Sequence, residues 1–465
     1  MALGWIFFAL LIAIIMLISL GKVEESIASL LGASFVSIIL MFYRGLSFNK
    51  ILEFANIKIL ITLLGIMIIV QISIRSGLFH FLALKAVKLT RGDPIKLFVI
   101  LNLISALMSI FISAVATIII MGSLTITIAK ILKTDPEPYM ISEGIIVDIG
   151  SIGLMFAFPS IVLIQLVSLD ALFFIENTLP YTLFNISLSI FFLKWMLVPY
   201  IKPVSEKRKI LLLEFDEWTF VPSKRALYST GIMLVIIISL MMYATHMIHH
   251  IALVGSMIML LISGLNPDEI FERILWTQIF FIAGLSVMVE AINYEGVLRA
   301  FGEALSNMFG ENMLLLLVVI LWTAGILGSI IDDVPIVLTM IPIVQTVALI
   351  NNIPPEQLYP FWTALLIGTL GGNFQVYGST PSMLSKGITE QFGYKYDTSL
   401  FFRVGSRLTL IQLSIGSIYV IFISFKQLIM SKIGLLYYAI LFAPGIIGML
   451  LIITKELGLI QKRIS

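Results

Sequence analysis

The chain has 465 residues, of which 59% are hydrophobic and 12% are charged, and its formal net charge at pH 7 is +2. Because a soluble domain is about one-quarter charged, this composition excludes a soluble globular protein and leaves no segment for a soluble catalytic domain. The absence of cysteine excludes disulfides and thiolate metal sites. We therefore expect an all-α polytopic membrane protein, in which ~20 apolar residues per crossing allow about eleven spans.

Uninterrupted apolar segments predict most of these spans. The first segment has no basic residue before it and no small-residue cleavage site after it, so we expect a retained span and not a signal peptide. The uninterrupted spans are predicted at 4–20, 23–43, 56–75, 182–200, 226–245, 251–265, 274–294, 406–425 and 434–453.

Four further apolar segments are interrupted by polar or glycine-rich stretches. Segments 95–133 and 313–350 are interrupted halfway, which predicts two re-entrant helical hairpins. Segments 139–167 and 359–388 contain glycine-rich interruptions, which predict broken helices. Irregular backbone in the hydrocarbon region is tolerated only where protein or a watery cavity surrounds it. We therefore expect the interrupted segments to converge on a transport site.

The interrupted segments belong to a repeat with a constant offset of 219 residues. Gly77 in the first copy corresponds to Gly296 in the second, and Ser113 corresponds to Asp332. Two membrane-embedded copies of one design, each with a broken helix, are typical of secondary transporters.

Basic residues in the linker 201–225 place it in the cytoplasm, since Lys and Arg accumulate on that side. The first hairpin has basic flanks and the second has acidic ones, which predicts inverted repeats. In this topology the protein is a multi-pass protein of the plasma membrane, with its N-terminus outside and its C-terminus in the cytoplasm. Arg44, Lys50, Lys426 and Lys432 would lie outside and oppose the charge rule.

The linker is the one sizeable polar segment, so it is the natural boundary between the halves. The predicted division is N-terminal spans at 1–50, a first repeat at 51–200, a cytoplasmic linker at 201–225, a second repeat at 226–425, and a C-terminal span and tail at 426–465.

The polar residues of the second repeat predict a cation or proton site. Asp332 and Asp333 stand side by side before Pro335 in the interrupted hairpin. A carboxylate at mid-bilayer costs at least ~2.5 kcal/mol, so a pair of them indicates function, and their repulsion would favour a proton when a cation leaves. A water-exposed hairpin tip is the alternative explanation. The second break adds Gly371, Gly372, Asn373, Gln375, Gly378, Ser379 and Thr380 as flexible backbone and oxygen ligands.

The first repeat carries fewer polar groups. Ser113 stands where the second copy has Asp332, and Thr117 follows it. Asp148 is the acid that lies deepest in an apolar run, so we assign it to the same candidate site. The break beside Asp148 contributes Gly150, Ser151 and Gly153.

Two further acids are candidate proton relays. Glu143 lies nearer the membrane edge, where a solvated role explains it equally well. Glu290 lies within an apolar span, where hydrogen bonds would equally well hold it neutral. We expect no catalytic residue, no cofactor beyond a transported Na⁺ or H⁺, and no metal site, because His246, His249 and His250 lack further donors.

Four segments resemble the ion transporter superfamily, which includes arsenite permeases, sodium/proton antiporters and citrate or dicarboxylate carriers. The segments are RGDPIKL at 91–97, TDPEPYMISEGIIVDIG at 134–150, SIIDDVPIVLTMIPIV at 329–344 and GGNFQVYGSTPS at 371–382. The family has an Asp-Asn pair at both hairpin tips. Asp332 and Asp333 match the second tip, with Asp in place of Asn, whereas Ser113 and Ala114 depart from the first. The resemblance implies an elevator transporter whose scaffold often forms a homodimer interface.

We predict a secondary active ion transporter, and Na⁺/H⁺ antiport is its sharpest form. The acidic pair favours a cation, and no Arg is predicted in the core to hold a dicarboxylate. An arsenite or citrate/dicarboxylate permease is the alternative. A channel or an intramembrane enzyme is more remote, since no H-E-x-x-H motif occurs. The expected partners are a small ion or small-molecule substrate and the lipid bilayer, with no nucleic acid.

Overall fold

The computed structural model describes residues 2–19, 23–214, 216–310, 312–434 and 436–456. These residues form α-helices, short 3-10 helices and one π-helix, with no strand among them. Eleven of the described helices are long and apolar enough to cross a membrane. The prediction of an all-α polytopic membrane protein is confirmed, while the predicted tail after residue 456 lies outside the described residues.

Two halves, residues 2–200 and 224–424, flank a linker and precede two final helices. The first half contains α1 (Ala2–Ser19), α2 (Glu25–Arg44), α3 (Phe48–Phe54), α4 (Ile57–Arg75), α5 (Leu78–Lys88), α6 (Pro94–Phe111), α7 (Ala114–Leu132), α8 (Glu137–Ser151), α9 (Phe158–Val167), α10 (Ala171–Phe173), the π-helix η1 (Phe174–Thr178), α11 (Leu179–Leu197) and η2 (Val198–Tyr200). The linker holds α12 (Glu206–Glu214) and η3 (Glu217–Phe220).

The second half contains α13 (Lys224–Tyr243), η4 (Thr245–Met247), α14 (Ile248–Ser263), α15 (Pro267–Phe271), α16 (Trp276–Tyr294), α17 (Val297–Phe309), α18 (Met313–Gly328), α19 (Asp333–Ile350), η5 (Pro355–Leu358), α20 (Tyr359–Thr369), η6 (Leu370–Phe374), η7 (Val376–Gly378), α21 (Thr380–Gln391) and α22 (Thr398–Ser424). The final helices are α23 (Lys426–Ile433) and α24 (Leu436–Glu456).

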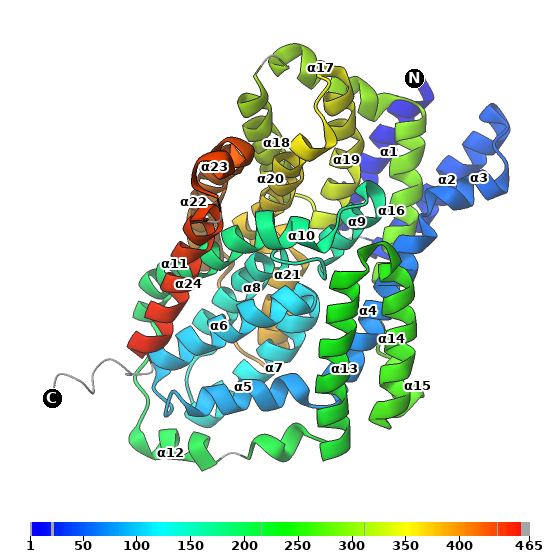
Figure 1. Ribbon diagram of the computed structural model, residues 1–465. Helices are drawn as coiled ribbons and strands as arrows, with labels where there is room; N and C mark the ends of the chain where they lie inside the picture. The colour runs from blue at the N-terminus through cyan, green and yellow to red at the C-terminus, as the bar shows by residue number, and fades with distance from the viewer. Residues whose placement is uncertain (1, 20–22, 215, 311, 435, 457–465) are drawn as a thin grey trace.

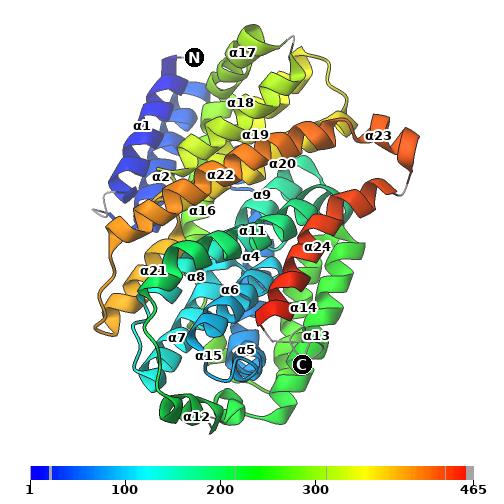
Figure 2. The same ribbon diagram turned by 90° about the vertical axis from the view of Figure 1, so that its left-hand side faces the viewer.

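Matching helices of the two halves begin at residues that differ by 219. Helices α5 and α17 begin at Leu78 and Val297, and the hairpins α6–α7 and α18–α19 begin at Pro94 and Met313. Helices α5 and α12 lie at one end of the molecule and α17 lies at the opposite end (Figures 1 and 2). The two hairpins therefore approach the middle of the molecule from opposite ends.

The halves pack against each other through matching helices. Helix α2 packs along α16, and α14 packs along α4. A methyl group added to Gly65 would lie 2.5 Å from the carbonyl carbon of Ala252, and one added to Gly284 would lie 2.6 Å from that of Ser29. Since these glycines are again 219 residues apart, the correspondence extends to α2, which our predicted division assigned to a separate region at 1–50.

The eleven membrane-length helices are not the same set as the predicted spans. They include both arms of the first hairpin, α6 and α7, and the second arm of the other hairpin, α19. The predicted broken helices are instead divided into shorter pieces, α8 with α9 and α20 with α21. The helices are interrupted at 112–113, 152–157, 329–332 and 370–379, within the four segments predicted to be irregular.

Ion pairs account for most of the basic residues that oppose the charge rule. The Arg44 guanidinium donates from Nε and Nη2 to the two carboxylate oxygens of Glu295, each at 2.7 Å. Lys426 pairs with Glu176, and Lys50 lies 2.6 Å from Glu53. These cations have acidic partners, so their charge is neutralised locally.

The broken helices form the centre of the fold. Every residue from Pro138 to Ser151 of α8 is buried, as is every residue from Pro360 to Thr369 of α20. By contrast, only 17% of the most apolar stretch of α24 and 28% of that of α13 is buried. The helix breaks therefore lie in the most enclosed part of the molecule, and α13 and α24 lie at its periphery.

Candidate ion-binding site

The tip of the second hairpin positions two aspartates. Asp332 precedes the first turn of α19 but makes no capping hydrogen bond to that helix. Its Oδ1 instead accepts hydrogen bonds from the backbone N–H of Thr380 at 3.3 Å and from the Thr380 hydroxyl at 3.1 Å. Pro335 lies in the first turn of α19, where its missing N–H leaves no helical bond unmade. The tip of the hairpin is thus held against the start of α21.

The second helix break also clamps this tip. The Gln375 amide donates to the carbonyl oxygen of Ser329 at 2.7 Å. A methyl group added to Gly371 would lie 2.0 Å from the carbonyl oxygen of Gly325, so only glycine permits this approach of the break to α18. Beyond the break, the Ser379 hydroxyl accepts from the backbone N–H of Ser382 at 3.3 Å and caps α21.

The first half contributes a third acid. Asp148 is 5% exposed and lies near the end of α8. The Ser379 hydroxyl of the other half donates a hydrogen bond to its carboxylate. Its backbone carbonyl accepts from the Ser151 hydroxyl at 2.8 Å. At the first hairpin tip, Ser113 accepts from the backbone N–H of Ala116 at 3.2 Å and caps α7.

These elements enclose a small cavity of about 40 Å³ at the junction of the two halves. It is lined by Ser113, Ala114, Val115, Asp148, Ser151, Ala157, Phe158, Pro159, Gln278, Asp332, Asp333, Val334, Thr380 and Pro381. Three of these residues are aspartates, and none is Lys, Arg or His. The sequence prediction that Asp148, Asp332 and Asp333 share a site agrees with this placement.

Asp332 also lines a second, larger pocket of about 510 Å³. This pocket is bordered by Ile15, Ile18, Glu25, Phe281, Ile330, Ile331, Pro335, Tyr377, Thr380 and Met383. Its lining again contains no basic residue. Because Asp332 and Thr380 line both spaces, the larger pocket lies directly beside the aspartate cavity.

Several buried oxygens around the small cavity lack a hydrogen-bond partner within the described part of the chain. They are Asp148 Oδ2, Asp333 Oδ1 and Gln278 Oε1. An unpartnered buried acceptor costs about 1–3 kcal/mol, and a bound cation or a proton would satisfy it. The described residues contain no group of three or more His, Cys, Asp or Glu side chains arranged to hold a metal ion.

Other predicted site residues lie outside the cavity lining. Thr117 donates to the Ser113 carbonyl at 3.1 Å, and Asn373 is fully buried without a partner for either amide atom among the described residues. Glu143 accepts from the Thr125 hydroxyl at 2.7 Å.

The remaining acid and the glycines are placed by the elements that carry them. Asn293 lies 3.5 Å from Glu290 on α16. Gly150 packs against the Ala106 carbonyl, the Gly153 carbonyl accepts from Thr178 at 3.0 Å, and the added carbon at Gly372 or Gly378 would meet the other's backbone.

Two lining residues escaped the sequence analysis. Gln278 lies on α16, where it is a polar residue at the start of an apolar span and corresponds to Ile59 of the first half. Glu25 begins α2, beside the capping residue Glu24. The polarity of Gln278 was a usable signal, but nothing local to Glu25 separates it from an ordinary residue of a helix terminus.

Comparison with known proteins agrees with this architecture. The solved structure of the YdaH transporter of Alcanivorax borkumensis has a TM-score of 0.52 and 15% identity, covering 79% of this chain and 85% of that one. An uncharacterized transporter of Mycobacterium bovis is 25% identical over 414 residues, which are 88% of this chain and 96% of that protein. The human P protein is 26% identical over 89% of this chain, which matches 59% of the P protein.

The fold and these likenesses define the class of protein, a multi-pass membrane transporter. Within that class, the model of the citrate transporter family, CitMHS, matches residues 11–368. The chain belongs to this family. The resemblance to the ion transporter superfamily, predicted from four sequence segments, is thereby confirmed.

Proposed function

We propose that the protein is a secondary active transporter that exchanges Na⁺ for H⁺ through the aspartate cavity. The observation that carries this proposal is the lining of the cavity, in which three aspartates and several hydroxyl and amide oxygens occur without a basic side chain. Oxygen ligands suit hard cations, and carboxylates also accept protons.

The size of the cavity supports a small ion. A volume of about 40 Å³ accommodates an occupant of roughly the ~30 Å³ that a water molecule takes up in the liquid. A tricarboxylate is several times larger. In the adjoining 510 Å³ pocket it would face Glu25 and Asp332 without a compensating Lys or Arg.

Electrostatics supplies the coupling between the two ions. Carboxylates that share one small cavity repel one another, and an entering cation relieves that repulsion. When the cation leaves, a proton provides the same relief. One cavity therefore holds either a cation or a proton, which is the requirement for exchange.

The alternative substrate is a citrate-like carboxylate, which the family description favours. The 510 Å³ pocket would then hold the carboxylate while the aspartate cavity held a coupling cation. An arsenite permease is the other alternative within the superfamily, and no feature of either pocket favours it.

For the transport cycle we propose inverted repeats that move as an elevator domain against a scaffold in the plasma membrane, with homodimerisation through that scaffold. The N-terminus would lie outside and the C-terminus in the cytoplasm. The opposite approach of the two hairpins and the 219-residue offset support this arrangement. We assign no catalytic step to any residue.

The test is flux into proteoliposomes that contain the full-length protein and an internal pH dye. External Na⁺, Li⁺, K⁺, citrate and arsenite would be added in turn, and radioactive citrate uptake would be measured in parallel. We expect Na⁺ to drive proton movement, and Asp148→Asn or Asp332→Asn to abolish it. Glu303→Gln is the control, because Glu303 lies on α17 in an i,i+4 pair with Arg299 at the surface.

Citrate uptake without any Na⁺-driven proton movement would overturn the antiport proposal and favour the carboxylate alternative. Loss of activity in the Glu303→Gln variant equal to that in the aspartate variants would show that acid removal is not specific to the cavity.

A further inference from the structure

Helix α24 lies outside the two matching halves and packs along α11. The two helices are closest at two glycines of α24. A methyl group added to Gly445 would lie 2.7 Å from the backbone nitrogen of Phe184, and one added to Gly448 would lie 2.7 Å from Cβ of Ser187. Beyond this contact the helices diverge toward the C-terminal end of α24.

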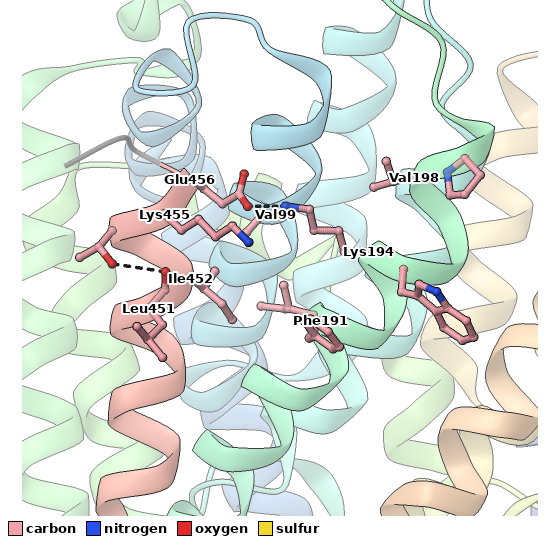
Figure 3. Close-up of a pocket in the computed structure, with 12 residues that line it drawn as sticks. Val99, Phe191, Lys194, Val198, Leu451, Ile452, Lys455 and Glu456 are labelled. Carbon is pink, nitrogen blue, oxygen red and sulfur yellow. Dashed lines mark hydrogen bonds and ion pairs between the residues drawn. The ribbon is translucent and has the colours of Figure 1, made fainter. Parts of the chain in front are cut away.

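The divergence opens a wedge-shaped pocket of about 820 Å³ (Figure 3). We call it the α11–α24 pocket. It is lined by Val99, Ile190, Phe191, Lys194, Trp195, Val198, Pro199, Leu451, Ile452, Thr454, Lys455 and Glu456. Val99 comes from α6, so three helices border the space.

The walls of this pocket are apolar and face outward. Phe191 is 72% exposed, Trp195 is 66% exposed and Leu451 is 58% exposed. In a bilayer such side chains contact acyl chains. Water finds few polar partners between these walls, and an empty wedge would forfeit dispersion contacts. Lipid chains are therefore the natural filling of its apolar part.

The other end of the pocket is charged. Lys194 pairs with Glu456, whose side chain is only 11% exposed. Lys455 has no ion pair within the described residues, and its side chain extends across the pocket toward Lys194 (Figure 3). The two lysines and the one glutamate leave a net charge of about +1 at this end.

We propose that the α11–α24 pocket binds an anionic phospholipid. Its acyl chains would lie along Phe191 and Leu451, and its phosphate would lie beside Lys455 and Lys194. A zwitterionic lipid would fill the same apolar wedge without gaining from the net positive charge.

The position of the pocket along the membrane normal supports an anionic lipid. The charged end follows α11 into η2 and the linker, which carries α12 at one end of the molecule (Figure 2). The basic residues of that linker are typical of the cytoplasmic side, whose leaflet attracts basic side chains through its anionic lipids. Trp195 lies at the level where tryptophan is enriched, at the membrane–water interface. This inference is independent of the transported ion.

The test uses the purified full-length protein in detergent. Phosphatidylglycerol and phosphatidylcholine would be added in parallel, bound lipid counted by native mass spectrometry, and thermal unfolding recorded. We expect phosphatidylglycerol to be retained and to stabilise the protein more than phosphatidylcholine does. Lys455→Gln should weaken its binding about fivefold, since one basic side chain near anionic lipid contributes roughly 1 kcal/mol.

The matched control is Lys432→Gln, which removes the same charge from an exposed lysine on α23, before the opposite end of α24. It should leave the lipid preference unchanged. Leu451→Trp should displace the lipid by filling the wedge, and if that variant fails to fold, the comparison of the two lysine variants still decides.

Four results would overturn the proposal. Equal retention of the two lipids would show that charge does not matter, and equal effects of the Lys455 and Lys432 variants would place the lipid elsewhere. Stabilisation by inorganic phosphate alone would identify a free-anion site. Cross-linking of two copies through a cysteine introduced at Trp195 would show that a second chain covers this face.

Discussion

The two hairpin tips occupy matching positions in the chain but direct their polar side chains differently. Ser113 accepts a hydrogen bond from Ala116 in its own helix at 3.2 Å. Asp332, 219 residues later, makes no bond to its own helix and accepts two from Thr380 instead. The first tip is closed on itself, whereas the second connects the hairpin to the broken helix of its own half.

This difference shows that the cavity is a joint product of two unequal halves. The first half supplies Asp148 from its broken helix, and the second supplies Asp332 and Asp333 from its hairpin. The tip without an acid still lines the cavity through Ser113. One site can therefore retain three carboxylates although the first tip has none.

Exchanging the polar group at each tip tests this inequality most strongly. We expect Asp332→Asn to lower Na⁺-driven proton flux at least about a hundredfold, because losing a buried charged partner costs roughly 3 kcal/mol. Ser113→Ala removes a helix cap worth about 1 kcal/mol and should lower flux by less than about fivefold. Initial rates in proteoliposomes, normalised to reconstituted protein, measure both.

Equal losses in the two variants would show that the tips contribute alike. A thermal unfolding curve recorded for each variant separates loss of fold from loss of transport, since Asp332→Asn should unfold near the wild-type temperature.

The irregular elements were predictable because polar or glycine-rich interruptions are costly in hydrocarbon unless protein encloses them. For that reason the breaks and the grouping of Asp148 with Asp332 follow from the sequence. The orientation of the remaining ligands does not. Gln278 reaches the cavity because α16 packs along α2, and Asn373 misses the lining because the backbone of an irregular break rotates it away.

Close packing of the breaks against the hairpins is a second point of comparison. Gly371 approaches the Gly325 carbonyl, and Gly150 approaches the Ala106 carbonyl at 2.2 Å, with Ala106 and Gly325 exactly one repeat offset apart. We expect Gly371→Ala to lower the free energy of unfolding by about 2–3 kcal/mol through overpacking. Thermal unfolding in detergent measures the effect.

The control is Gly387→Ala on α21, where an added methyl meets nothing within 4 Å. It should raise stability by about 0.5–1 kcal/mol, because alanine favours a helix more than glycine does. A Gly371→Ala variant as stable as the wild type would mean that the break is free to move away from α18.

The linker gives the smallest expected difference between the halves. Gly77 and Gly296 both have positive φ, of 75° and 83°, but an added methyl at Gly77 would lie 2.2 Å from the Phe220 carbonyl oxygen, whereas at Gly296 it meets nothing within 4 Å. The linker is held there by the Lys88–Glu217 ion pair, which lowers the pKa of Glu217 below its usual value.

Replacing each glycine by alanine should cost about 1 kcal/mol for the backbone conformation alone. Gly77→Ala should cost about 1 kcal/mol more than Gly296→Ala, because it also displaces the linker. That extra cost should shrink as the pH falls through the lowered pKa of Glu217, since protonation removes the ion pair that holds the linker in place. Unfolding of the two variants at neutral and acid pH measures this difference. A difference that stays constant with pH would show that the aromatic contacts of the linker, Phe81 with Trp218 and His80 with Phe220, hold it without the ion pair.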